Sequence, residues 1–146
     1  MKAIFNFVIA ISLLSTATVH ADIIKKTVFE NIDKGVYSQY EEESNKQHII
    51  EIYTQNEWKN FWDQHTIGTF PSPELPKIDF QKYFILIAID EIRSSGGYTL
   101  EIKEITIDTA FENRPFEIAV IINFPGSAAG TTAALTRPYH IVKIKK

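Results

Sequence analysis

Histidine, serine and carboxylate side chains are the candidates for chemistry in this chain of 146 residues, which contains no cysteine. A Ser-His-Asp arrangement would have to combine residues from distant parts of the chain: Ser95 or Ser127, His140, and Asp79 or Asp90. The sequence has no G-x-S-x-G turn to present a serine nucleophile. It also has no HExxH, HxH or carboxylate cluster that places two metal ligands on one face. We therefore expect no catalytic residue, metal or cofactor, and keep a small hydrolase as an alternative.

The histidines that follow the N-terminal segment fit structural roles better. His48 and His140 share the parity of neighbouring apolar residues in β-prone runs, so each is predicted to face a core. His65 lies on the apolar stripe of a predicted helix. All three are expected to be partly buried side chains whose nitrogens have partners.

Residues 79–107 form the stretch around which the other elements are expected to be arranged. Tyr83–Ile89 is an unbroken apolar run, typical of a strand covered on both faces. Gly96 and Gly97 can take the positive φ angles of a sharp reversal, and an alternating strand begins at Tyr98. We predict a β-hairpin here, with a β-bulge at Lys103-Glu104, where the apolar positions change phase.

One helix is predicted with its start at a capping box. Thr54 and Glu57 have the spacing of that motif, and an aromatic stripe follows at i, i+3, i+4 and i+7: Trp58, Phe61, Trp62 and His65. A stripe of this kind is far more often a core face than a cofactor site. The helix should end near Gly68, because the proline-rich segment that follows cannot continue it.

The remaining β-prone runs complete the predicted fold. An N-terminal hairpin is expected from Thr27–Ile32 and Val36–Tyr40, with its turn at Asp33-Lys34-Gly35. Three more strands are expected at residues 48–53, 116–124 and 139–145. The fold class is mainly β or α+β: an antiparallel sheet of six to seven strands with one covering helix, in a single domain over residues 22–146.

The first 21 residues are typical of a secretory signal peptide. Lys2 precedes the apolar run Ala3–Leu14, and Val19-His20-Ala21 fits the small-x-small pattern before a cleavage site. The run is shorter than the roughly 20 residues of a spanning helix. We expect a periplasmic or secreted bacterial protein without a membrane anchor after cleavage. With 18 acidic against 15 basic side chains, nucleic acid is not an expected partner.

The order of several short motifs resembles the PrcB-like family, which is named for a protease complex subunit of bacterial cell surfaces. The residues that carry the resemblance lie between about Phe29 and Lys146: Gly35-Val36-Tyr37-Ser38, Glu57-Trp58, Phe61-Trp62, Leu75-Pro76-Lys77-Ile78-Asp79-Phe80, Ser95-Gly96-Gly97-Tyr98 and Thr136-Arg137-Pro138-Tyr139-His140-Ile141-Val142. The resemblance implies a non-catalytic exported domain that binds or stabilises a protease, with no active-site residues to carry over. The chain departs from some relatives in lacking a lipoprotein cysteine, and in having Ser94-Ser95 where a threonine often precedes the glycines.

Two turns are also similar to those of chagasin-type cysteine protease inhibitors, which bind through three adjacent loops. These are Ser95-Gly96-Gly97-Tyr98 and Arg137-Pro138-Tyr139. We expect the Arg93–Tyr98 turn and the Pro125–Pro138 loop to lie at one end of the sheet and to bind a protein partner, with a protease as the candidate. The predicted partner-binding residues are Arg93, Ser95, Gly96, Gly97, Tyr98, Arg137 and Tyr139, and both arginines are predicted to be exposed.

Export should remove residues 1–21, so that the mature protein begins at Asp22 and carries no lipid. Intact-mass measurement of the exported protein tests this expectation. Recovery of a membrane-bound species that retains Met1 would contradict it.

Overall fold

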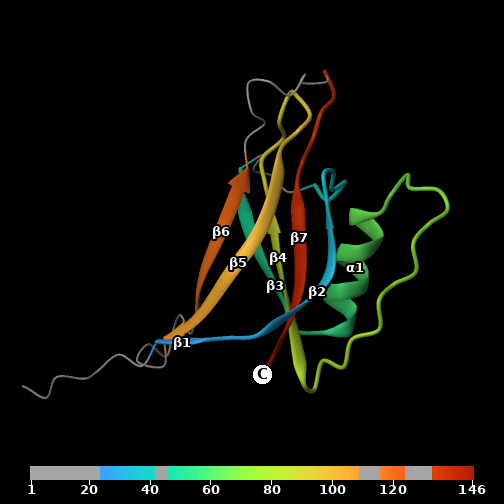
Figure 1. Cartoon of the computed structure of the whole chain (residues 1–146). Helices are drawn as coiled ribbons and strands as arrows, with labels where there is room; N and C mark the ends of the chain where they lie inside the picture. Colours follow the sequence, from blue (N-terminus) through green and yellow to red (C-terminus); the bar gives the residue numbers. More distant parts are fainter. Residues whose placement is uncertain (1–23, 42–45, 109–115, 124–132) are drawn as a thin grey trace, which may run out of the picture.

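The computed structural model describes residues 24–41, 46–108, 116–123 and 133–146 (Figure 1). The predicted signal peptide and the loop residues 109–115 lie outside the described residues, as do 42–45 and 124–132. The elements, in chain order, are β1 (Ile24–Lys26), β2 (Phe29–Gly35), β3 (His48–Ile52), α1 (Gln55–His65), β4 (Tyr83–Ile89), β5 (Thr99–Asp108), β6 (Phe116–Asn123) and β7 (Tyr139–Lys145).

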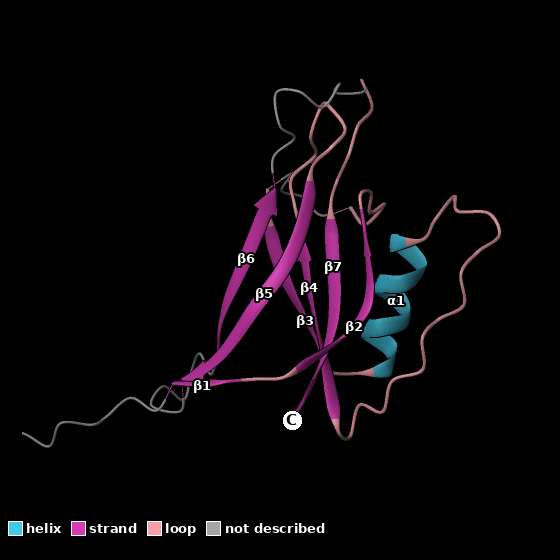
Figure 2. Cartoon of the chain, in the orientation of Figure 1, coloured by secondary structure: helices cyan, strands magenta, loops and turns pink. Residues whose placement is uncertain are grey.

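The strands form two antiparallel sheets with one helix beside them, so the predicted mainly β class is confirmed (Figure 2). A four-stranded sheet has the order β2-β7-β4-β3, and a three-stranded sheet has the order β1-β5-β6. The prediction of a single sheet was wrong. A core cluster on one face of the four-stranded sheet includes α1, and the cluster on the other face includes β5, which makes three layers.

β4 is the buried central strand of these layers, as its sequence predicted. It pairs with β7 on one side and β3 on the other. Ile85, Ile87 and Ile89 pack toward α1, whereas Leu86 and Ala88 pack toward β5. Every side chain from Ile85 to Ile89 is fully buried. The unbroken apolar run therefore reflects two covered faces.

The expected hairpin between β4 and β5 does not form. Both edges of β4 are occupied, while β5 pairs with β1 and β6 in the other sheet. The link from Asp90 to Tyr98 therefore carries the chain from one sheet to the other. Gly97 has φ +89°, so the predicted reversal with a left-handed glycine is present at that position. The predicted bulge is also confirmed, since the β5–β6 register shifts between Ile102 and Glu104.

The predicted N-terminal hairpin was wrong as well. Asp33, Lys34 and Gly35 belong to β2 and pair with β7 instead of forming a turn. Gly35 lies under the ring of Tyr139, where a Cβ atom would stand only 2.8 Å from ring atoms. A glycine can allow a left-handed φ or the close approach of another group. At Gly35 it allows the close approach of the Tyr139 ring, and the sequence analysis had interpreted it as a turn residue.

α1 begins and packs as predicted. Both halves of the capping box are present at Thr54 and Glu57, and the stripe Trp58, Phe61, Trp62 and His65 is buried against the sheet. The proline-rich segment returns along the helix, because Trp58 Nε1 donates to Pro76 O at 2.9 Å and Trp62 Nε1 donates to Pro73 O at 3.3 Å. Within the described residues, no helix has the length and hydropathy needed to cross a membrane.

Replacement of Trp62 by alanine should lower the free energy of unfolding by about 3–5 kcal/mol, because it opens a cavity between α1 and the sheet. Lys59→Ala on the exposed side of the same helix is the control, and should change it by less than about 0.5 kcal/mol. Urea denaturation measures both. Equal stability of the two variants would show that the stripe is not part of the core.

Candidate functional site

Three chain segments are joined by backbone hydrogen bonds at the end of the sheets where β2 finishes and β7 begins. We call this region the loop end; it consists of Val36–Ser38, Asp90–Tyr98 and Leu135–Pro138. Arg137 N donates to Val36 O at 2.9 Å and Ser38 N donates to Arg137 O at 3.0 Å. Arg93 and Thr136 exchange hydrogen bonds of 2.7 and 3.0 Å. The two predicted loops do lie together, for the part of the second loop that the structure describes.

Arg93 is held in place by carboxylates. Its Nε and Nη2 donate to the two oxygens of Asp90 at 2.9 and 3.0 Å, and its Nη1 lies 2.6 Å from Glu91 Oε1. Asp90 is fully buried, so this bidentate pair satisfies a carboxylate that would otherwise be costly to bury. The guanidinium lies 5.1 Å from the ring centre of Tyr98. Arg93 is thus partly buried and restrained instead of fully exposed.

Arg137 was predicted to be exposed, but only 3% of its surface is accessible. Its backbone pairs with the Val36–Ser38 segment, and its side chain turns inward to reach the carbonyl oxygens of Tyr40 and Asp90. Tyr139 is buried as well, with its ring over Gly35. Both residues therefore tie segments together, which removes them from the predicted partner surface in this conformation.

The serine and glycines of the turn differ among themselves in exposure. Gly97 is exposed, Ser95 and Tyr98 are half-buried, and Gly96 is buried. Thr136 Oγ1 donates to Ser95 O at 2.9 Å, so the turn is fixed against the segment that precedes β7. Of the predicted partner-binding residues, Arg93, Ser95, Gly97 and Tyr98 retain accessible surface.

Sequence reasoning missed four apolar side chains that the loop end exposes. Val36, Tyr37, Ile92 and Leu135 have between 40% and 62% of their surface accessible. We call this group the apolar rim. Val36 and Tyr37 had been assigned to a strand because they are β-prone. Ile92 and Leu135 adjoin Arg93 and Thr136, whose pairing brings them to the same end. Only the backbone pairing of the three segments identifies the group.

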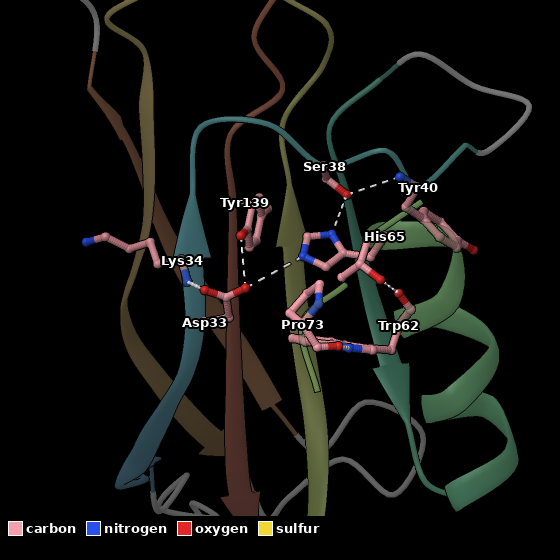
Figure 3. Close-up of polar contacts among 9 residues, drawn as sticks. Asp33, Lys34, Ser38, Tyr40, Trp62, His65, Pro73 and Tyr139 are labelled. Atoms are coloured by element: carbon pink, nitrogen blue, oxygen red, sulfur yellow. Dashed lines mark hydrogen bonds and ion pairs between the residues drawn. The ribbon is translucent and has the colours of Figure 1, made fainter. Parts of the chain in front are cut away.

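A serine, a histidine and an aspartate that sequence reasoning did not combine meet between β2 and α1 (Figure 3). Ser38 Oγ lies 2.9 Å from His65 Nδ1, and His65 Nε2 lies 3.7 Å from Asp33 Oδ2. Tyr139 donates its hydroxyl to the same Asp33 oxygen at 2.9 Å. Tyr40 N donates to Ser38 Oγ at 3.2 Å, which leaves the serine proton free to bind His65.

The burial of this network favours a structural role. Ser38 has 1% of its surface accessible, so a substrate cannot reach its hydroxyl in this conformation. The His65 ring nitrogen, with the Tyr139 hydroxyl, lowers the pKa of Asp33, whereas burial raises the pKa of Tyr139. The network therefore keeps a charged carboxylate beside a neutral phenol, and links β2 to α1 and β7.

Both ring nitrogens of His140 have hydrogen-bond partners, as predicted. Ile102 N, at the bulge of β5, donates to His140 Nδ1 at 2.8 Å, and His140 Nε2 contacts Asn31 Oδ1. His140 thereby connects the two sheets. His48 Nδ1 lies 2.9 Å from Lys46 O. Within the described ranges, no three histidine or carboxylate side chains are grouped closely enough to hold a metal ion.

A comparison with protein families matches residues 84–145 to the model described as PrcB C-terminal. The matched segment runs from β4 to the end of β7, and includes the Asp90–Tyr98 link and Arg137. It is shorter than the stretch over which the sequence motifs suggested the resemblance. No curated protein and no solved structure matches the chain.

His140 should titrate below its ordinary pKa of 6.5, because burial opposes its charged form. Because folding lowers the pKa of His140, the folded protein binds the proton less tightly than the unfolded chain does. The contribution of His140 to the free energy of unfolding is therefore complete above about pH 6.5, and is lost as the pH falls toward the pKa of the folded state. NMR titration of its Cε1 proton measures the pKa, and urea denaturation at pH 7.5 and 5.5 measures the stability. Between these two pH values, the free energy of unfolding should change less in His140→Gln than in the wild type. A His140 pKa above 6.5 would contradict the assignment.

Proposed function

We propose that the protein, whose residues 84–145 match the PrcB C-terminal family model, is an exported module that binds a protein partner. The partner is a protease, which the module binds or stabilises without chemistry of its own. The family description supports association with a protease complex.

The observation that carries the proposal is the apolar rim. Its four large apolar side chains are exposed on segments fixed by backbone hydrogen bonds, and not on long free loops. Burial of such side chains gains about 25 cal/mol per Å² of apolar surface, and a fixed backbone loses little conformational entropy on binding. Arg93 and Tyr98 border the rim, and arginine and tyrosine are common anchors at interfaces. The loop end is therefore suited to a protein surface.

The two alternatives are less well supported. A chagasin-like inhibitor would need the Arg137-Pro138-Tyr139 turn as a contact, but all three residues are buried. A small hydrolase would need an accessible nucleophile, and Ser38 in the Ser38–His65–Asp33 network is buried. Each alternative makes its own biochemical prediction: inhibition of a papain-type protease in the first case, and loss of hydrolysis in Ser38→Ala in the second.

Export to the envelope is part of the proposal, because a partner of this class would be met there. Affinity capture from the envelope fraction, with the protein as bait, would identify the partner by mass spectrometry. A proteolytic assay of the captured material then tests whether the partner is a protease. Capture of a protein without proteolytic activity would contradict the proposal that the partner is a protease. The binding surface is tested separately, by substitution in the apolar rim.

Val36→Asp should weaken capture of the partner about tenfold or more, because it places a charge in the apolar rim. Val28→Asp is the matched control, since Val28 and Val36 flank β2 at its two ends and are 87% and 54% exposed. Both variants should melt within a few degrees of the wild type. Equal capture by the two variants would remove the apolar rim as the binding surface.

A further inference from the structure

A groove separates α1 from the outer strand of the four-stranded sheet. Its volume is about 290 Å³, and a second hollow of about 220 Å³ adjoins it at Gln64. The groove is lined on one side by α1 and on the other by β3, with Tyr40 also in the lining. Neither the family match nor the apolar rim includes this part of the chain.

The strand that borders the groove has an open edge. β3 stands last in the order β2-β7-β4-β3, and among the described residues it pairs only with β4. An outer strand presents backbone N–H and C=O groups that can pair with another chain. Proteins often protect such an edge with lysine, proline or a bulge, and the segment from His48 to Ile52 contains none of these; its one charged side chain is the carboxylate of Glu51. The edge is therefore able to accept a further strand.

The helix side of the groove presents one polar stripe above an apolar floor. Glu57, Asn60 and Gln64 follow each other at i, i+3 and i+7, and all are exposed. Phe61, Ile50 and Ile52 form the floor, and they belong to the core cluster or pack against it. From Glu57 to Gln64 the helix rises by roughly 10 Å, which matches about three residues of an extended chain.

The charges that line the groove have one sign. Glu57 lines the helix side of the main groove and Glu41 lines the adjoining hollow. Glu51 belongs to the lining strand but pairs with Leu86, so its side chain lies on the opposite face of β3. No lysine or arginine lines either hollow. The Thr54 hydroxyl and the backbone of the capping box lower the pKa of Glu57, so it remains a carboxylate. A ligand that carries positive charge beside apolar groups would complement this lining.

From the open edge and this lining we infer a second binding site, in which an extended segment of another polypeptide pairs with β3 in the groove. In that segment, apolar residues alternate with lysine or arginine. Alternate side chains of a strand point to opposite sides, so the apolar ones meet the floor while the basic ones lie on the opposite face of β3, beside Glu51. Backbone pairing with β3 supplies the remaining contacts, as in other cases of strand addition.

The test uses a blocked hexapeptide of alternating lysine and valine, and its analogue in which glutamate replaces each lysine. The protein is labelled with 15N, and amide shifts are followed during titration. The lysine peptide should shift the amides of His48–Ile52 and of Glu57–Gln64, and should bind about tenfold more tightly than the glutamate analogue. Two further peptides carry N-methyl groups on every second backbone nitrogen, one on the odd positions and one on the even positions. Only one set of N–H groups faces β3, so one of these two peptides should not bind.

Asn60→Arg should weaken the lysine peptide about tenfold or more, because it adds bulk and positive charge to the helix side. Asn56→Arg is the control, since Asn56 is exposed on the same helix but does not line the groove. Melting curves establish that both variants are folded. Absence of binding, equal binding of the two peptides, shifts confined to the loop end, or unchanged affinity in Asn60→Arg would each overturn the inference.

Discussion

Burial of both faces of β4 is the constraint on which the rest of the structure depends. A strand without an exposed side chain needs a cover on each face and a partner on each edge. α1 and the three-stranded sheet supply the covers, while β3 and β7 supply the partners. Since both edges are taken, β5 has to leave the four-stranded sheet. The path of the chain from Asp90 to Tyr98, and thus the loop end, follows from this requirement.

Buried polar contacts fix how the layers meet. Apolar packing between layers tolerates small shifts, whereas a hydrogen bond between buried groups has one geometry and is costly to leave unmade. His140 binds a backbone N–H of β5 from β7, and so sets one sheet against the other. His65 binds Ser38 and lies beside Asp33, and so sets the helix against β2. The histidines are structural joints between the layers.

Local sequence signals were reliable where the local chain decides the outcome. The capping box at Thr54, the apolar run of β4 and the phase change near Lys103 each predicted a feature that is present. Predictions failed where a residue far away in the sequence determines the conformation or the exposure of a side chain. Gly35 was interpreted as a turn because nothing near it shows that the Tyr139 ring lies above it. Arg137 was expected to be exposed, since arginine is rarely buried without partners. Its partners are carbonyl oxygens from segments about 50 and 100 residues away, which the local sequence does not reveal.

The position of β7 has a consequence for how the chain folds. β7 lies between β2 and β4 in the sheet, although it follows both of them in sequence by many residues. Neither β2 nor β4 can complete its pairing until β7 has been synthesised. The segments made earlier must therefore wait as an open chain, and the closure of such distant contacts makes folding slow. The last strand of the chain is thus the one that completes the pairing of the central strand.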